Sequence, residues 1–322
     1  MKSLWNTWLA LDANLRGIIC ATTGMLIFTA QDAAIKFLSP DYALHQIIFT
    51  RSVVAIVLTV LVARLTLGIG AIRTRRPGWH VFRASLLVTM NLSYFLALAS
   101  LPIAETAGLF FVAPLLITLL SVPILKERLG PRRILAVVCG FAGMLMIVRP
   151  GGDVFQLIAL APLLAAACYA IMQLSTRVMG RTETALAMAF YAQLTFITVS
   201  AGFGLVTGDG SFETADNASL AFLLRAWRTP DAFSFMLMLA CGLSVAFGAV
   251  LLSEAYRIAA PATLAPFEYV ALPASILWGF AVFGQLPDYL AFAGIALIGS
   301  SGLYVFFREQ KLAAQREKDS RE

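Results

Sequence analysis

Long apolar runs separated by short polar segments fill almost the whole chain. Most runs hold about 20 residues, which is the length that a helix needs to cross the hydrocarbon core of a bilayer. Because lipid offers backbone N–H and C=O groups no partner, a helix is the expected form of each run. The pattern predicts an all-α integral membrane protein with ten transmembrane helices, near residues 17–38, 43–63, 81–101, 104–125, 131–149, 154–176, 184–206, 232–256, 262–284 and 289–307.

The connections between the runs are short, so neighbouring helices are expected to run antiparallel. The longest connection spans about residues 207–231. Within it, residues 220–227 allow two interpretations, a short amphipathic helix lying at the interface or an ordinary loop. Polar residues interrupt the first 16 residues and no cleavage site follows them, so the pattern is not that of a signal peptide, and we expect the first run to stay as a helix.

The basic residues are distributed unequally between the two ends of the predicted helices. Nineteen of the 24 Lys and Arg residues fall on the side of the N-terminus, four fall on the other side, and Arg51 lies within a run. Positive residues favour the cytoplasmic side of a membrane protein. We therefore expect a multi-pass protein of the cell inner (plasma) membrane with an even number of helices and both termini in the cytoplasm.

Composition agrees with a lipid environment and excludes several other classes. The chain is 60% hydrophobic and only 13% charged, whereas a typical soluble domain carries roughly 25% charged residues. Its net charge of +6 follows from the basic clusters between the runs, so we expect membrane lipid and no nucleic acid as partner. The four cysteines lie in apolar runs without a CxxC pair and are expected to be packing residues; no metal and no cofactor are expected.

The two halves of the chain are weakly similar when one is shifted by 158 residues. The shift places Ala97 on Ala255, Ala104 on Ala262, Phe111 on Tyr269 and Glu127 on Gln285, and one residue later Gly140 and Gly143 on Gly299 and Gly302. It predicts two five-helix units, 1–150 and 151–322, the second ending in a cytoplasmic tail. An odd number of helices inverts the second unit, as in many secondary transporters with a substrate site near the membrane midplane. The alternative is an old duplication in a protein that transports nothing.

The chain resembles the drug/metabolite transporter superfamily of the EamA type over about residues 16–307. The resemblance is carried by Asp32-Ala-Ala-Ile-Lys36, Gln46-Ile-Ile-Phe-Thr-Arg51, Tyr94 to Ala107, Pro114, Leu125-Lys-Glu-Arg128, Glu254-Ala-Tyr256 and Pro266-Phe-Glu-Tyr269. It departs from the family pattern at Gln285, where an acidic residue is common. The resemblance implies ten helices in two five-helix halves and a transport function.

Charged side chains inside the runs are costly, so each is a functional hypothesis. Asp32 and Lys36 are four residues apart on one helix face, close enough to pair, either to bind or gate a charged substrate or to neutralise each other. Arg51 could bind or gate a substrate, form a structural ion pair, or extend to water. Gln193 is its approximate counterpart in the second half.

The second half contributes acidic candidates, Glu254 and Glu268, with Tyr269 beside the latter. Either carboxyl could take up a proton and couple transport to a proton gradient, hold a cationic substrate with the Tyr269 ring, or bond to a neighbouring helix. Further polar or aromatic residues are candidates for substrate contact or for packing, namely Asn91, Tyr94, Tyr169, Gln173, Tyr191 and Tyr256.

These features favour a secondary-active transporter of a small organic metabolite over a membrane enzyme, a channel or a scaffold. The sequence contains neither a His/Asp cluster nor a Gly-Xaa-Ser-Xaa-Gly turn, so we do not expect an enzyme. The mixed charges suit a zwitterionic or charged substrate, and the Asp32 and Arg51 motifs look like the branch that includes S-adenosylmethionine and riboflavin carriers. Export of amino acids or related metabolites is the alternative, and either a monomer or a homodimer fits.

Overall fold

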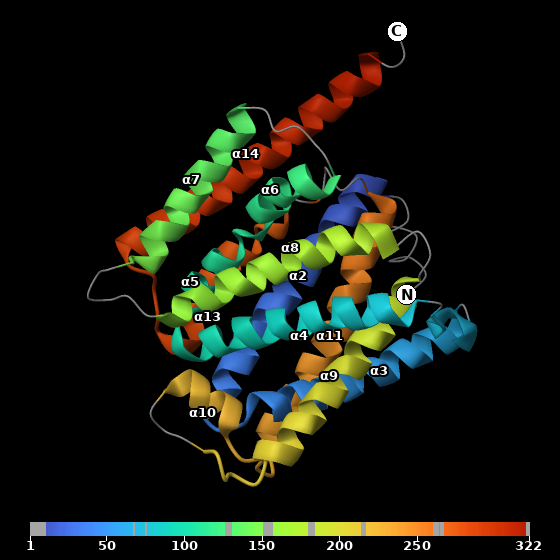
Figure 1. Ribbon diagram of the computed structural model, residues 1–322, viewed down its shortest axis with the longest axis vertical. Helices are drawn as coiled ribbons and strands as arrows, with labels where there is room; N and C mark the ends of the chain where they lie inside the picture. The colour runs from blue at the N-terminus through green and yellow to red at the C-terminus, as the bar shows by residue number, and fades with distance from the viewer. Residues whose placement is uncertain are drawn as a thin grey trace.

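The computed structural model describes residues 11–66, 68–74, 76–125, 131–150, 157–179, 184–213, 217–259, 264 and 267–319, and these residues fold into helices and turns without a strand. The α-helices are α2 (Ala13–Leu38), α3 (Leu44–Leu65), α4 (Pro77–Ser100), α5 (Ile103–Phe110), α6 (Ala113–Leu125), α7 (Pro131–Val148), α8 (Ala161–Met179), α9 (Ala185–Thr207), α10 (Ala218–Leu224), α11 (Ala232–Ile258), α13 (Ala271–Phe283) and α14 (Tyr289–Asp319) (Figure 1). Two short 3-10 helices are η1 (Ile69–Ile72) and η2 (Leu157–Leu160).

The all-helical membrane fold predicted from the sequence is confirmed. Six described stretches are long and apolar enough to cross a membrane, and four shorter apolar helices lie at 134–148, 157–173, 271–283 and 289–304. Together these ten segments match the ten predicted runs, although part of the run 262–284 lies outside the described residues. Polar caps set several helix ends: Asp231 accepts a hydrogen bond from the Ser234 N–H at 2.7 Å where α11 begins.

The helices alternate in direction, so each end of the bundle gathers alternate helix ends. We call the end where α2, α4 and α13 finish and α11 begins the distal end; the charged C-terminal part of α14 projects from the opposite, proximal end (Figure 1). The described residues of the connection, 208–213 and 217–231, lie at the distal end. Its α10 confirms the helical interpretation as far as Leu224, whereas 225–231 are not helical.

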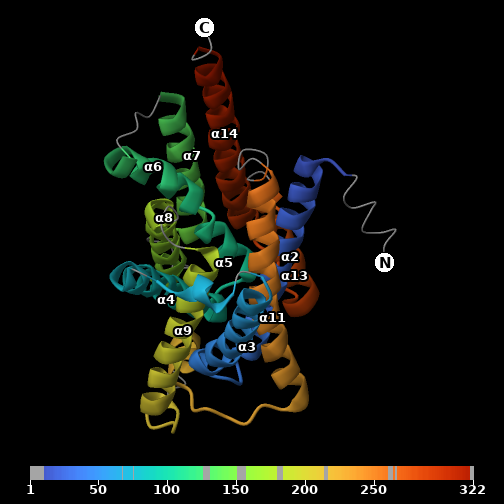
Figure 2. The same cartoon turned by 90° about the vertical axis from the view of Figure 1, so that its right-hand side faces the viewer.

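The main helix pairs follow a regular pattern. α7 packs against α14, α3 against α9, α2 against α11 and α4 against α8 (Figure 2). α3 also contacts α11 while α9 contacts α4, and α2 contacts α13 while α8 contacts α6. Exchanging each helix for the one at the same place in the order of the other predicted half turns these contacts into one another.

The fourth predicted run, 104–125, matches the candidate membrane span Ile103–Leu120, but the structure divides it into two helices. α5 ends at Phe110, a turn occupies 111–112, and α6 begins at Ala113. Pro114 explains the break, because proline has no N–H for the carbonyl four residues earlier and its ring crowds that carbonyl. A second break occurs at 269–270, just before α13, and Pro273 follows it in the same way.

Candidate substrate pathway

The carboxylate Asp32 on α2 contacts α4 through a tyrosine. The Tyr94 hydroxyl donates a hydrogen bond to Asp32 Oδ2 at 2.9 Å. Both side chains lie well inside the bundle and yet are only half-buried, so neither is sealed by packing. A half-buried carboxylate can accept hydrogen bonds from, or attract the positive charge of, a molecule that reaches it.

Aromatic side chains extend the site from α4 through α5 to α8. The Tyr94 and Phe110 ring centroids are 5.3 Å apart, and those of Phe110 and Tyr169 are 5.5 Å apart. We call these three residues the aromatic row; all three are half-buried. Gln173 donates a hydrogen bond through Nε2 to the Tyr169 hydroxyl at 2.7 Å. The rings of the row thus pack edge-on or tilted against one another, with polar groups at both ends of the row.

A second carboxylate lies at the far end of the aromatic row. Glu268 is half-buried and close enough to Tyr169 and Tyr269 for its charge to act on both hydroxyls. Tyr269 in turn contacts the Phe111 ring, with centroids 5.3 Å apart. The two helix breaks thus meet through the aromatic residues that the 158-residue shift superimposes.

Arg51 on α3 is enclosed, unlike Asp32. Its Nη2 donates to Asn91 Oδ1 at 2.8 Å, and its guanidinium lies over the Phe95 and Phe196 rings at 5.3 and 5.6 Å. The amide of Gln31, oriented with its oxygen toward the guanidinium, accepts from Nη1 at 3.2 Å. Arg51 is only 4% exposed.

This environment corrects two of the alternatives for Arg51. It does not extend to water, and no described carboxylate lies within ion-pair distance of it. Its partners are amides and aromatic rings, which tie α3 to α2, α4 and α9.

Lys36 does not pair with Asp32, although the two are one helical turn apart. Its ammonium donates to the Leu98 carbonyl at 2.8 Å and to the Leu101 carbonyl, both at the distal end of α4, and it lies 5.6 Å from the centre of the Phe283 ring. The last carbonyls of a helix have no partner within it and carry partial negative charge, which a cation satisfies. Lys36 thus joins α2, α4 and α13 at the distal end.

Comparisons with known proteins find transporters. Residues 15–149 match the EamA-like transporter family. The first half of the chain is therefore similar to that family. A riboflavin transporter of Brucella anthropi is 29% identical over 80% of this chain and 86% of its own length, and one of Vibrio cholerae is 28% identical over 95% and 97%. An S-adenosylmethionine uptake transporter of Rickettsia prowazekii is 26% identical over 96% and 98%.

A solved structure supports the fold of this chain. A protein crystal structure superimposes with a TM-score of 0.62 over 93% of this chain and 98% of that one, at 19% identity. The likeness at this level of identity concerns the helix arrangement alone.

Two predicted site residues lie away from the aromatic row. Glu254 on α11 is half-buried and interacts electrostatically with Cys20, which is twelve residues, or roughly 18 Å of helix, from Asp32. Gln193 on α9 is half-buried and makes no side-chain hydrogen bond among the described residues. The structure thus brings Asp32, Tyr94, Tyr169, Gln173, Glu268 and Tyr269 together. Arg51 and Asn91 form a neighbouring cluster, close enough for the Arg51 and Asp32 charges to act on each other.

Sequence reasoning missed Phe110 and Gln31. Phe110 lies in an apolar run, where the sequence does not distinguish it from a packing residue. In the structure a helix break follows it, and its ring contacts those of Tyr94 and Tyr169. Gln31 precedes Asp32 and is 6% exposed. Gln31 is a neutral polar residue in an apolar run, as Gln193 is, and the same reasoning could have made it a candidate.

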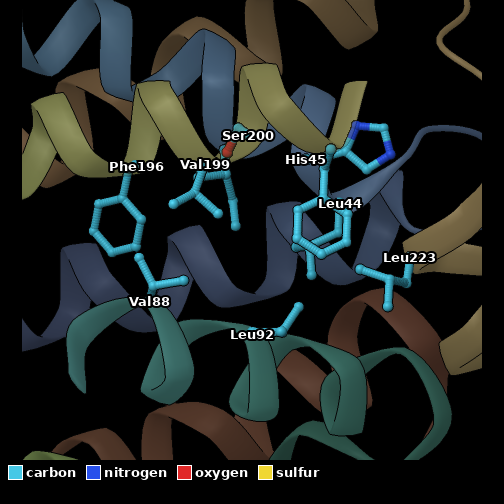
Figure 3. Close-up of a pocket in the computed structure, with 10 residues that line it drawn as sticks. Leu44, His45, Val88, Leu92, Phe196, Val199, Ser200 and Leu223 are labelled. Carbon is cyan, nitrogen blue, oxygen red and sulfur yellow. The ribbon is translucent and has the colours of Figure 1, made fainter. Parts of the chain in front are cut away.

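A cavity of about 30 Å³ lies between α3, α4, α9 and α10 (Figure 3). Its walls are almost wholly apolar and include Leu92, Phe196 and Val199, with His45 and Ser200 at its edge. A space of this size holds a water molecule or two and no metabolite. None of the predicted site residues lines it, so it is not the substrate site of the transporter.

Proposed function

We propose that this metabolite transporter carries a compound with a fused nitrogen heterocycle and a hydroxylated carbon chain, by alternating access. The aromatic row between the Asp32 and Glu268 carboxylates is the observation that supports this class of substrate. Stacking on an aromatic side chain contributes about 1–3 kcal/mol per base, because every such ring has a π-face. The carboxylates, the tyrosine hydroxyls and Gln173 then offer partners to hydroxyl and amino groups.

The names of the relatives favour the same class. Riboflavin and S-adenosylmethionine, for which the relatives are named, both join a fused nitrogen heterocycle to a hydroxylated five-carbon unit. S-adenosylmethionine also carries positive charge, which two carboxylates attract. Riboflavin is neutral and would rely on the rings and hydrogen bonds. The pair of carboxylates therefore favours S-adenosylmethionine, and the relatives of 28–29% identity favour riboflavin.

The proposed architecture is two inverted five-helix units, residues 1–150 and 151–322. Three observations support it: the family match ends at residue 149, the contacts exchange when helices are paired by their order in the two halves, and both helix breaks fall at positions 158 residues apart. An interface between inverted units near mid-membrane suits alternating access. The aromatic row and Glu268 combine residues from both units.

The proposed orientation places both termini in the cytoplasm and the distal end outside the cell. It rests on the unequal distribution of Lys and Arg residues. In the same proposal Asp32, Glu254 or Glu268 carries the coupling proton, since each is a carboxyl group placed in a membrane-spanning region.

Uptake by purified protein in lipid vesicles tests the proposed function. Radiolabelled riboflavin and S-adenosylmethionine are offered separately, with the unlabelled compounds, an amino acid mixture and inositol as competitors. We expect saturable uptake of at least one of the two, competition by the other at higher concentration, and none by inositol. Uptake that amino acids suppress and neither heterocycle affects would instead support amino acid transport.

A further inference from the structure

The two helix breaks meet through a tyrosine that lacks a hydrogen-bond partner. Tyr269 is 9% exposed, and its hydroxyl bonds to no described residue. A buried hydroxyl without a partner destabilises the conformation that contains it, because the group has lost water and gained nothing. Such a group calls for an explanation, and a carrier that adopts a second conformation provides one.

Gly302 on α14 creates the space that the Tyr269 side chain fills. A Cβ atom at position 302 would overlap the Tyr269 hydroxyl oxygen and lie 2.7 Å from its Cζ. One turn earlier, Gly299 has more room, since a Cβ there would lie 4.0 Å from Tyr269 Cδ1 and 3.3 Å from the tip of Leu272. Gly302 is therefore the α14 residue whose lack of a side chain admits the ring; we call this arrangement the Tyr269 seat.

The Tyr269 seat is linked to the distal end of the bundle by one short helix. Tyr269 and Val270 form the turn that begins α13, and α13 ends at Phe283. The Phe283 ring lies 5.6 Å from the Lys36 ammonium, which also holds the last carbonyls of α4. If α13 tilts about its break, Phe283 withdraws from Lys36 and the distal contacts weaken.

We propose that Gly302 and Tyr269 are positioning residues that stabilise the distally closed conformation, and that Tyr269 leaves its seat when the distal end opens. The inference rests on the proposed alternating-access function. The unpartnered hydroxyl destabilises the distally closed conformation, so that opening costs less free energy. The fit of the ring against Gly302 stabilises that same conformation. Removing the hydroxyl should shift the equilibrium toward the closed conformation, whereas disturbing the fit of the ring should shift it toward the open one.

Thiol labelling at Ser39 measures this equilibrium without any substrate. Ser39 is 7% exposed and its carbonyl accepts a hydrogen bond from Arg225 at 2.6 Å, so distal contacts cover it in the closed conformation. Ser39→Cys is introduced into the full-length chain, the purified protein is reacted with a bulky maleimide, and the labelling of the chain without Ser39→Cys is subtracted.

We expect Gly302→Ala to raise the Ser39→Cys labelling rate by roughly tenfold, because the added methyl overpacks the seat. Gly299→Ala is the matched control and should leave the rate within about twofold, since its methyl meets only the mobile tip of Leu272. Tyr269→Phe should lower the rate severalfold, because it keeps the ring and removes the unpartnered hydroxyl.

Equal labelling rates in Gly302→Ala and Gly299→Ala would overturn the proposal. If Gly302→Ala does not fold, Tyr269→Phe decides, and an unchanged or faster rate there overturns it as well. Because labelling needs no transported compound, a wrong substrate assignment leaves this test intact. Conversely, uptake of neither heterocycle with the expected labelling pattern would reject the substrate and retain the Tyr269 seat.

Discussion

Two polar clusters lie inside the bundle, and they differ in how far their charged groups are enclosed. The Arg51 cluster is closed: Nη2 and Nη1 of the guanidinium are bonded to Asn91 and Gln31 and two phenyl rings cover the group, while Nε has no partner among the described residues. The Asp32 cluster is open: its carboxylate accepts a hydrogen bond from Tyr94 and remains half-buried beside the aromatic row. Both place a charge at membrane depth, and the Asp32 carboxylate is the one that keeps exposed surface for another molecule.

The difference teaches that depth in the membrane does not by itself indicate function. An ion buried away from water is costly, and a cluster can offset that cost either with fixed protein partners or with a bound substrate. Arg51 follows the first route and Asp32 the second. The comparison predicts that changes in the closed cluster reduce stability, whereas changes in the open cluster reduce transport.

The largest effect is expected from Arg51→Ala. It removes a buried side chain and leaves the Asn91 and Gln31 amides without their partner, which should destabilise the protein by about 1–3 kcal/mol for each unsatisfied amide. The yield of folded protein and the apparent melting temperature in detergent measure the loss. Arg51→Lys serves as the control, because it keeps the charge and loses the planar fork. Its yield and melting temperature should lie between those of the wild type and of Arg51→Ala.

A stable Arg51→Ala protein that has lost all uptake would break the comparison. It would mean that the guanidinium contacts the substrate and that its enclosure belongs to one conformation of the cycle only. The expected result is instead a parallel loss of folded protein and of uptake, with unchanged uptake per folded molecule in Arg51→Lys.

Asp32→Asn is expected to lower transport by roughly 10- to 100-fold with little change in melting temperature. The amide keeps the size of the side chain and can still accept from Tyr94, but it removes the negative charge, and a charge-assisted hydrogen bond contributes about 1.5–3 kcal/mol. Initial uptake rates over a substrate series separate KM from the maximal rate. An unfolded Asp32→Asn protein would place Asp32 with the closed cluster.

Phe110→Leu should raise KM by about tenfold, since it replaces the central ring of the aromatic row with an aliphatic group of smaller area. Its matched control is Phe95→Leu, which makes the same substitution at a ring that covers Arg51. Phe95→Leu should lower the melting temperature and leave KM nearly unchanged. Reversed outcomes for the two variants would exchange the roles of the clusters.

The helices were predictable from sequence because lipid imposes a simple requirement, an apolar run of sufficient length. The break at 111–112 was missed for a local reason: Pro114 lies among apolar residues, and a count of hydropathy does not register a missing N–H. The same omission concealed the break before Pro273. Hydropathy thus finds the spans, and proline positions are needed to divide them.

The site was only partly predictable because interhelical contacts are set by packing. Spacing places Asp32 and Lys36 on one face, yet Lys36 bonds to the end of α4, since unpaired carbonyls there compete for its ammonium. Residue spacing could not identify the partner of Arg51 either, because Asn91 is forty residues away in the chain. The candidate residues were recognisable by type; which of them meet was not.

The smallest expected effect concerns an ion pair outside the membrane-spanning segments, which provides a reference for both clusters. At the distal end, the Arg149 guanidinium and the Leu290 and Ala291 N–H groups hold the pKa of Asp288 below its usual value. The carboxyl therefore contributes stability above its unfolded pKa, and that contribution disappears as the pH falls through the lower, folded pKa. Because the Asp288 side chain is 50% exposed, we expect a difference of only a few tenths of a kcal/mol between wild type and Asp288→Asn at neutral pH. Melting temperatures of both proteins, measured from pH 7 down to the acid limit of folding, should converge at low pH. A difference that grows on acidification would show that Asp288 is stabilised in its protonated form and would remove it as a reference for the buried charges.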